Sequence, residues 1–330
     1  MAQLVARFHG MEEVRGSNPL ISTMKSKVKI PARWDTSAIP DLTGKNFLIT
    51  GATSGLGLET AKALAAKNAQ VTITARSAAK GEKALKQTGA QEFIELDLAD
   101  LSSVHKAAKE VKKKYDVVFL NAGIMVPPFT KTVDGFESQM ATNHLGHFAF
   151  TGLIAKQITG RVVVTSSFAH RLGNLGDGTK KEIENRIRGI GKYSPWGAYG
   201  DSKLANLLFV NELERMRVKN GGFIPVAAHP GWANTNLFAH EEKTNFFAQM
   251  GHLFGRIAQS ASQGALPQLC AGTYAGISKS VFIGPEHFEL RGHPKITRAK
   301  SLAYDAELAA NLWQVSESLT GVAWENSVHA

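Results

Sequence analysis

Thr50-Gly51-Ala52-Thr53-Ser54-Gly55-Leu56-Gly57 lies between an apolar run at residues 46–49 and a segment with helical spacing at residues 58–68. This order predicts a strand, a glycine turn and a helix. Such a turn presents backbone N–H groups and the positive end of a helix dipole to a pyrophosphate, and glycine lets the backbone approach closely. We therefore expect a dinucleotide site, with an ordinary glycine-rich surface loop as the alternative. Its candidate binding residues are Gly51, Thr53, Ser54, Gly55, Leu56 and Gly57.

The composition is that of a globular protein with a substantial core, because 43% of the 330 residues are hydrophobic. No apolar run approaches the roughly 20 residues that span a bilayer, so we predict no transmembrane helix. The single cysteine, Cys270, excludes an intrachain disulfide and a cysteine-based metal cluster. We expect no metal site and a reducing compartment, the cytoplasm.

The chain is basic, with a formal net charge of +10. Its Lys and Arg residues are scattered among Asp and Glu, and no patch of interleaved aromatic and basic residues is present. We therefore expect no nucleic-acid partner. Attraction of an anionic cofactor or substrate is the favoured use of the positive charge.

The first 23 residues do not resemble a folded segment. Residues 16–19, Gly-Ser-Asn-Pro, can be encoded by GGT-TCG-AAT-CC, the T-arm of a transfer RNA, and residues 2–5 can be encoded by a D-arm. We expect residues 1–23 to be a non-native or disordered leader and Met24 to begin the native protein. Residues 24–41 are expected to form an irregular N-terminal arm, and residues 323–330 a C-terminal tail.

Apolar and β-branched runs predict six more strands, separated by helical segments, at residues 70–74, 92–96, 116–120, 161–165, 223–228 and 281–284. Alternating strands and helices favour a parallel sheet with helices on both faces. We predict a single α/β domain at residues 42–322, a doubly wound Rossmann-type fold. Its mostly parallel sheet would have seven strands in the order 3-2-1-4-5-6-7.

Three of these strands end in residues that suit a dinucleotide. Arg76 follows the second strand, where a basic side chain can accommodate the extra phosphate of NADP, although it could also be a solvated loop cation. Asp97, followed by Leu98, could accept a hydrogen bond from an adenine amino group, or Asp97 or Asp100 could cap the next helix. After the fourth strand, small residues would let the backbone pack beside a cofactor, at Asn121, Ala122 and Gly123.

A long helical pattern at residues 134–156 contains Asn143, a poor helix former that suggests a kink or a bound water. His144 and His147 lie three residues apart in the same pattern, with no acidic or third ligand nearby. We interpret the two histidines as packing or surface residues. Residues 170–197 are irregular and long enough to suggest a functional loop.

Tyr199 and Lys203 are four residues apart at the start of a predicted helix, which places them on one face. An adjacent ammonium favours the phenolate, so Tyr199 is a candidate acid or base near neutral pH. Aromatic residues flank this candidate site and suggest a hydrophobic aldehyde, ketone or alcohol, or else plain core: Phe129, Phe168, Trp196, Trp232 and Phe238. Residues 232–257 are either a lid over such a substrate or core filler.

Seven motifs together resemble the short-chain dehydrogenase/reductase family over residues 42–322: TGATSGLG, DL at Asp97, NAG at Asn121, the helical Asn143, TSS ending at Ser167, YGDSK at Tyr199 and HPGWANT at His229. Within the family, NHLGHF, VVVTSSFAH, SKLANLLF and LWQVSESLTG resemble the branch of retinol dehydrogenases and light-dependent protochlorophyllide reductase.

The resemblance implies a catalytic tetrad. Tyr199 would donate the proton, and Lys203 would bind the nicotinamide ribose and lower the pKa of Tyr199. Ser167, rather than Ser166, would hold the substrate oxygen, and Asn143 would hold a water of the proton relay. The implied cofactor contacts also include Asn121 and three residues after the sixth strand, Pro230, Gly231 and Thr235.

The implied function is hydride transfer between NADP(H), preferred over NAD(H), and a lipophilic carbonyl or its alcohol, with Tyr199 as proton donor. Two alternatives remain: a C=C reductase of the protochlorophyllide reductase type and a non-catalytic NADPH-binding sensor or scaffold. The family further implies a homodimer or homotetramer through the helices of Asn143 and Tyr199. A C-terminal extension could block one such interface.

Overall fold

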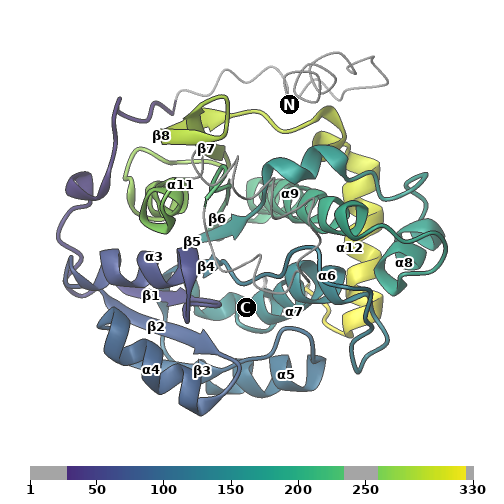
Figure 1. Cartoon of the computed structure of the whole chain (residues 1–330), viewed down its shortest axis with the longest axis horizontal. Coiled ribbons are helices and arrows are strands. Elements are labelled where there is room, and N and C mark those ends of the chain that lie inside the picture. The colour runs from purple at the N-terminus through teal and green to yellow at the C-terminus, as the bar shows by residue number, and fades with distance from the viewer. Residues whose placement is uncertain (1–27, 234–258, 325–330) are drawn as a thin grey trace, which may run out of the picture.

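Strands of four to eight residues, most of them apolar runs, form one continuous sheet in the computed structural model, which describes residues 28–233 and 259–324. The sheet has eight strands in the order β3-β2-β1-β4-β5-β6-β7-β8 (Figure 1). The strands are β1 (Asn46–Ile49), β2 (Gln70–Ala75), β3 (Glu92–Glu95), β4 (Tyr115–Leu120), β5 (Ile158–Thr165), β6 (Ile224–Ala228), β7 (Phe282–His287) and β8 (Arg291–Thr297).

The predicted doubly wound fold is confirmed, with one strand more than expected. Strands β1 to β7 pair in parallel, whereas β8 returns antiparallel to β7 as a hairpin. The sequence of β8 escaped recognition because it contains Gly292 and Pro294 among polar residues. Proline is tolerated on an edge strand, where its missing N–H faces no partner strand.

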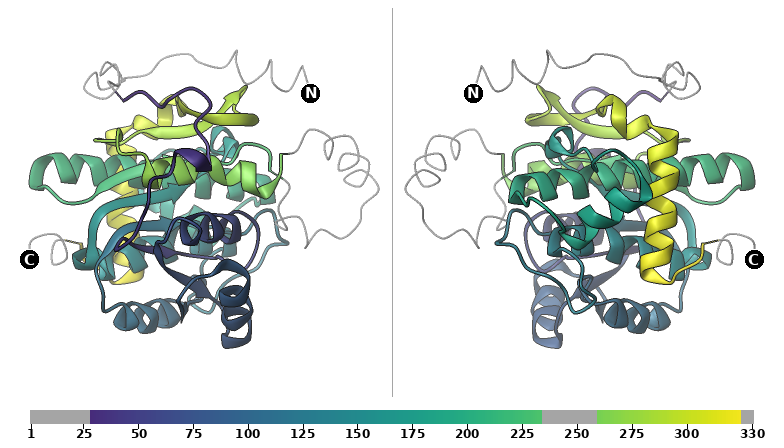
Figure 2. Two further views of the ribbon diagram at one scale, coloured as in Figure 1. Left: turned by 90° about the vertical axis from the view of Figure 1, so that its left-hand side faces the viewer. Right: turned by 90° about the vertical axis from the view of Figure 1, so that its right-hand side faces the viewer.

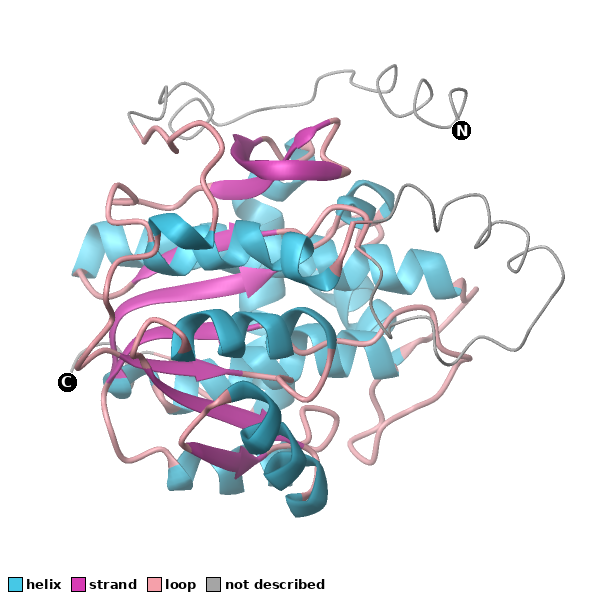
Figure 3. Cartoon of the chain, turned by 60° about the vertical axis from the view of Figure 1, so that its left-hand side comes forward, coloured by secondary structure: helices cyan, strands magenta, loops and turns pink. Residues whose placement is uncertain are grey.

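Helices cover both faces of the sheet, as Figures 2 and 3 show. One face carries α3 (Gly55–Ala65), α4 (Ala78–Thr88) and α11 (Ala261–Thr273). The other carries α5 (Leu101–Glu110), α6 (Ser138–Met140), α7 (Gly146–Leu153), α8 (Lys180–Arg188), α9 (Pro195–Asn220) and α12 (Ala306–Thr320). Short helical turns are η1 (Thr36–Ala38), η2 (Ala141–Leu145), η3 (Ala155–Gln157), η4 (Phe168–Leu172) and η6 (Ser301–Tyr304).

Each face of the sheet has its own hydrophobic core. Along β5, Val162 and Val164 belong to the core beneath α7, α9 and α12, while Val163 belongs to the core beneath α3 and α11. This alternation follows from the two-residue period of a strand. The arm before β1 joins the second core, because Trp34 and Ile39 are buried there.

Two predicted segments differ from the structure. The stretch 170–197, expected to be irregular, contains the end of η4 and all of α8. Thr179 caps α8 at its start, because its side chain accepts from the N–H of Glu182. The helix ends at Gly189, whose φ lies in the left-handed region. A Thr-x-x-Glu box with a glycine after the last turn was the available signal. The expected helix at 134–156 is divided into α6, the π-helical turn η2 and α7.

Some expectations fall outside the described residues: the leader at 1–23, nearly all of the lid at 232–257, Thr235 and Phe238. Within the two described ranges, no helix combines the length and apolarity required to cross a membrane.

The C-terminal helix α12 packs against α9 and α7 and fixes the end of the described chain. The rings of Phe148, Phe209, Trp313 and Trp324 form a cluster in which Trp324 lies 4.9 Å from Trp313 and 5.5 Å from Phe148, measured between ring centroids. Trp324 is fully buried, so the folded domain extends at least two residues past the expected boundary at 322.

Replacing Trp324 with Ala is expected to lower the free energy of unfolding by about 3 to 5 kcal/mol, because a large aromatic side chain leaves a cavity that its neighbours fill only partly. Urea denaturation followed by circular dichroism measures the loss. The control is Val218→Ala, which truncates an apolar side chain that is 72% exposed and should change stability by less than about 0.5 kcal/mol. Equal midpoints for the two variants would contradict the burial of Trp324.

Candidate active site

The glycine turn brings three backbone segments into contact. A Cβ at Gly57 would lie 2.4 Å from the carbonyl oxygen of Gly51, and a Cβ at Gly51 would lie 2.7 Å from the Cβ of Ala122. Gly51 also has φ of 68°, in the left-handed region. Only glycine fits at these two positions, which explains the spacing of the motif.

Thr50 joins the glycine turn to the end of β4. Its Oγ1 accepts from the backbone N–H groups of Asn121 at 2.9 Å and Ala122 at 3.0 Å, and the Asn121 side chain donates to the carbonyl of Thr50. Gln268 of α11 donates to Asn121 Oδ1 at 3.2 Å. The side chain of Asn121 is therefore saturated by protein contacts, and it aligns the two turns on which a cofactor would lie.

A basic pocket of about 490 Å³ lies beside the first turn of α3. Thr53, Ser54 and Gly55 line it, and so do three cations, Arg76, Lys80 and Lys83. Ser54, the residue before α3, makes no side-chain capping bond to the helix within the described chain, so the first-turn N–H groups remain for a ligand. Sequence reasoning missed Lys80 and Lys83, although their spacing places them on one face of α4.

Tyr199 and Lys203 lie on the inner face of α9, which begins at Pro195 with Ser194 as its cap. Both are nearly enclosed, with 5% and 4% of their surfaces exposed. The Lys203 Nζ lies 5.6 Å from the centroid of the Tyr199 ring and donates to the carbonyl of Thr165 at 3.2 Å. The helix thus presents an ammonium beside a phenol at the carboxyl edge of the sheet.

Burial sets the protonation of this pair. It raises the pKa of Tyr199 to about 12, while a hydrogen bond with the Ser167 side chain acts in the opposite direction. It also lowers the pKa of Lys203 from 10.5 to about 8. Without a cofactor, Tyr199 is therefore a neutral phenol at pH 7, contrary to the expectation that the ammonium would favour the phenolate. A neutral phenol can donate a proton.

The two serines after β5 have different environments. Ser166 is buried and donates to the carbonyl of Lys203 at 2.9 Å, which fixes the strand to α9. Ser167 is only partly buried, and its side chain lies near enough to the Tyr199 hydroxyl to oppose the rise of the Tyr199 pKa. Of the two, Ser167 is the one placed with Tyr199.

Asn143 lies in the π-helical turn η2, a device that often marks functional sites. Its side chain accepts from the N–H of Ile124 at 2.8 Å and donates to Ser202 Oγ at 3.0 Å. Its backbone carbonyl accepts from His147 Nδ1 at 3.2 Å. His147 Nε2 is thereby left to accept from the hydroxyl of Thr50 at 2.9 Å, so this buried histidine links η2 to the glycine turn.

The other candidate cofactor residues lie along the same edge. Asp97 accepts from the N–H of Ala99, whereas Asp100 is the N-cap of α5. Of the two carboxylates that could have capped this helix, Asp100 is therefore the one that does. Leu98 packs against Gly146, since a Cβ there would lie 2.3 Å from the Leu98 carbonyl oxygen. Gly123 approaches the tetrad, because a Cβ on it would lie 3.0 Å from Asn143 Oδ1 and 3.5 Å from Lys203 Nζ.

Pro230 and Gly231 follow β6, so the candidate residues in the described chain all come from the carboxyl ends of β1 to β6 or from the helices beside them. This is the edge at which doubly wound sheets bind ligands. In the described part of the chain, no three His, Cys, Asp or Glu side chains are grouped to hold a metal ion.

Comparison with known proteins shows which proteins this chain is similar to. The family model described as short chain dehydrogenase matches residues 45–177. Human retinol dehydrogenase 11 is 35% identical over 294 residues, which cover 85% of this chain and 87% of that protein.

Solved structures show the same fold. The crystal structure of an uncharacterised protein from Mycobacterium paratuberculosis is 39% identical and superposes with a TM-score of 0.75 over 89% of this chain and 99% of that one. A short chain dehydrogenase from Burkholderia cenocepacia, solved in complex with NADP, is 21% identical with a TM-score of 0.56 and covers 77% of this chain and 98% of its own. At that identity it shows the fold alone.

Replacing Lys203 with Met is expected to stabilise the cofactor-free protein by on the order of 2 kcal/mol at pH 7, because the substitution removes a buried ammonium. Since the folded pKa is about 8 and the unfolded value 10.5, the folded chain releases this proton first as pH rises. The unsubstituted protein therefore gains stability between those pH values, and the advantage of the variant shrinks.

Urea denaturation at pH 7 and pH 10 measures the difference. Lys219→Met is the matched control, because Lys219 is an exposed lysine on the same helix. A stabilisation by Lys203→Met of equal size at both pH values would show that the buried charge is not its cause.

Proposed function

This chain belongs to the short-chain dehydrogenase/reductase family, in the branch similar to retinol dehydrogenases, and we propose that it is an NADP(H)-dependent oxidoreductase that interconverts a lipophilic carbonyl and its alcohol. The observation that carries the proposal is the enclosed pair of Tyr199 and Lys203, with Ser167 beside Tyr199.

The residues fit a dinucleotide. The uncapped start of α3 offers N–H groups and a positive dipole to a pyrophosphate. The absence of a Cβ at Gly57 and Gly51 leaves the backbone open to close approach. When bound, the nicotinamide ring would supply or accept the hydride. Asn121, Pro230 and Gly231 would lie along it, as would Thr235 beyond the described residues.

The residues of the tetrad divide the proton chemistry. Tyr199 holds a proton at pH 7 and would deliver it to the developing alkoxide, which Ser167 would also stabilise. Lys203 would bind the ribose, and its charge would stabilise the phenolate that remains. Asn143 would hold the water that returns the proton.

The charge of the basic pocket beside α3, where the adenosine of the cofactor would lie and which we call the adenosine pocket, supports NADP(H) over NAD(H). Arg76, Lys80 and Lys83 surround it, and no carboxylate lines it among the described residues. A 2′-phosphate would neutralise part of this charge, whereas a ribose hydroxyl would not. An acidic side chain in place of Arg76 would favour NAD(H).

Substrate, compartment and assembly are proposed on further features. Phe129 is 45% exposed and packs against Tyr193, with their ring centroids 4.8 Å apart and their planes tilted. The rings of Trp196 and Tyr199 are 6.3 Å apart between centroids, and these exposed and neighbouring aromatic rings support a lipophilic substrate. The single buried free cysteine, Cys270, supports the cytoplasm. A homodimer or homotetramer would need surfaces other than those of α7 and α9 that α12 covers.

The central test is oxidation of NADPH, followed at 340 nm, by purified protein with a panel of lipophilic aldehydes and ketones. We expect turnover that falls about 10²- to 10⁴-fold in Tyr199→Phe, because the general acid is lost. Full activity of that variant would disprove the assignment of Tyr199. Tight NADPH binding with no turnover on any member would instead favour C=C reduction or the sensor role.

A second test addresses the cofactor. Arg76→Ala is expected to raise the Kd of NADPH about 10- to 100-fold and to leave that of NADH nearly unchanged, because a charge-assisted bond to the 2′-phosphate is lost. Fluorescence titration measures both constants. Lys86→Ala, which removes a cation of α4 outside the pocket, is the control. Equal weakening of both cofactors by Arg76→Ala would contradict the assignment.

A further inference from the structure

The tip of the β7–β8 hairpin has an unusual backbone. Phe288 and Glu289 have φ of 53° and 59°, so two consecutive residues with side chains occupy the left-handed region. The N–H of Leu290 donates to the carbonyl of His287 at 2.9 Å, so the tip is a tight hairpin turn of the kind that usually has Gly or Asn at its centre. A residue with a larger side chain costs on the order of 1 kcal/mol or more at each of these positions. The conformation turns the Glu289 side chain inward, where it is 21% exposed, while Phe288 is 84% exposed.

Donors from three elements converge on the Glu289 carboxylate. Arg171, in η4, reaches Oε1 with Nη2 at 3.4 Å, and the hydroxyl of Thr297, in β8, donates to the same oxygen. The imidazole of His229, at the end of β6, lies 3.7 Å from Oε2. The carboxylate thus joins two segments of the active-site wall that are far apart in sequence.

The His229 tautomer follows from its other bond. The backbone N–H of Gly231 donates to Nδ1 at 3.3 Å, so this nitrogen carries no proton. Burial lowers the pKa of His229 to about 3, which keeps the ring neutral at pH 7. The single ring proton is therefore on Nε2, the atom that faces Glu289. Glu289, His229 and Gly231 form a line from the hairpin to the candidate cofactor turn.

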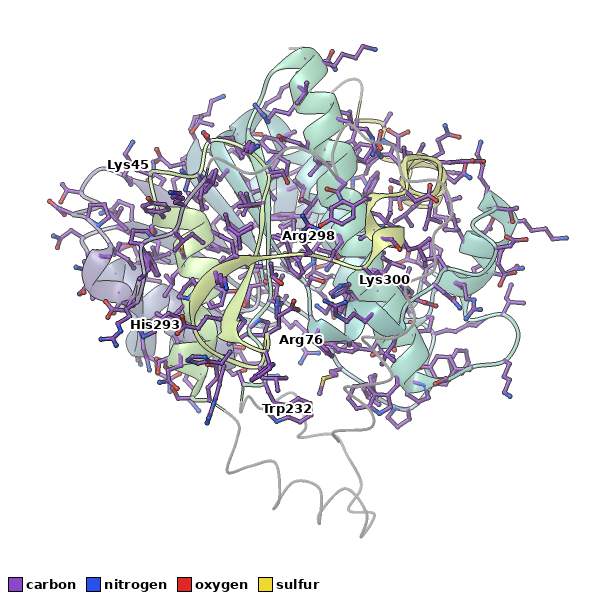
Figure 4. All side chains as sticks on the ribbon, turned by 90° about the horizontal axis from the view of Figure 1, so that it is seen from above. Lys45, Arg76, Trp232, His293, Arg298 and Lys300 are labelled. Carbon is purple, nitrogen blue, oxygen red and sulfur yellow. The ribbon has the colours of Figure 1, made fainter. Side chains whose placement is uncertain are left out.

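Arg171 extends the same connection toward Ser167. It lies in η4, which starts one residue after Ser167, and its guanidinium stacks 5.3 Å from the Phe168 ring centroid. His170, in η4, accepts from the N–H of Lys300 with its Nε2 at 3.2 Å. Its Nδ1 therefore carries the ring proton and donates to the carbonyl of Ser167 at 2.7 Å. Arg298 and Lys300, which support η4 from outside, are labelled in Figure 4.

The backbone of the hairpin docks on the cofactor turn as well. The N–H of Trp232 donates to the carbonyl of Leu290 at 2.7 Å, and a Cβ at Gly231 would lie 2.3 Å from that same oxygen. Gln259 bridges the two segments, because its amide donates to the carbonyl of Pro230 and accepts from the N–H of Gly292.

Stability alone does not account for the cluster. Among the described residues, three of its buried polar atoms have no hydrogen-bond partner: Arg171 Nε, His229 Nε2 and Glu289 Oε2. Buried charged and polar groups left without partners destabilise a fold. An incompletely satisfied ion pair, on a hairpin turn with Phe and Glu where Gly or Asn is usual, indicates a functional constraint.

We propose that Glu289 is a positioning residue for the proposed reaction, which holds Ser167, through Arg171, and the Pro230–Gly231 turn, through His229, at a fixed separation. The inference rests on the proposed function. Ser167 would hold the substrate oxygen and the turn would hold the nicotinamide, so their separation sets the distance between the carbonyl carbon and the hydride. Small errors in such a distance cost large factors in rate.

The test is Glu289→Gln, which keeps the size of the side chain and removes its charge. We expect kcat to fall about 10- to 100-fold, with the Kd of NADPH changed less than about threefold, because the adenosine pocket lies at the other end of the site. The deuterium isotope effect on kcat with labelled NADPH should rise as hydride transfer becomes rate-limiting. A variant that merely unfolded more would lose active sites without a change in isotope effect.

A mutant cycle shows whether Glu289 acts through Arg171. If it does, Arg171→Met combined with Glu289→Gln should lower kcat no more than the worse single variant. Glu286→Gln is the matched control, because Glu286 lies on the same hairpin and pairs with His287. Additive losses, or an equal effect of the control, would overturn the proposal.

Hydrogen exchange gives a readout that needs no substrate. In Glu289→Gln, amide exchange should accelerate at least about tenfold in peptides covering 167–172 and 229–233, and not in Glu286→Gln. Unchanged exchange in both peptides would overturn the positioning role even if no substrate is found. Normal kcat in Glu289→Gln with an inactive Tyr199→Phe would overturn this inference alone, whereas a wild-type chain without turnover would count against the proposed function.

Discussion

The close contact between the glycine turn and the end of β4 is the constraint on which the site depends. At Gly57 and Gly51 a single Cβ would collide with the backbone of the turn or with Ala122. Because these atoms touch, Thr50 can bind two N–H groups of the β4 turn, and His147 can join Thr50 to Asn143. One steric requirement therefore connects the glycine turn to Asn143.

The site keeps polar groups in places where the fold gains little from them. Lys203 is an ammonium with 4% of its surface exposed, and burial lowers its pKa to about 8. Glu289, which has a positive φ at the tip of the β7–β8 hairpin, forms an ion pair with Arg171 of η4. Such features oppose stability and persist where the chemistry requires them. The apolar cores on both faces of the sheet and the aromatic cluster beneath α12 stabilise the fold and so offset the cost of these buried polar groups.

Local sequence was sufficient for the parts of the site that follow regular elements. Seven strands and the positions of Tyr199 and Lys203 on one helix face came from short-range periodicity, which a central strand or a long helix imposes directly. Lys80 and Lys83 were missed because exposed lysines on a helix are common, and only the pocket distinguishes them. The helix α8 was missed because it is polar, although its capping residues were visible.

The sequence by itself determined the fold class, the edge of the sheet that carries the site and the chemical groups present, because glycine spacing and apolar period are local properties. Only the tertiary structure decided how those groups are buried and which of them meet. It buried Tyr199 and raised its pKa instead of lowering it, and it brought Glu289 to His229 and Arg171. These outcomes depend on burial and on contacts across more than fifty residues, which no local pattern encodes.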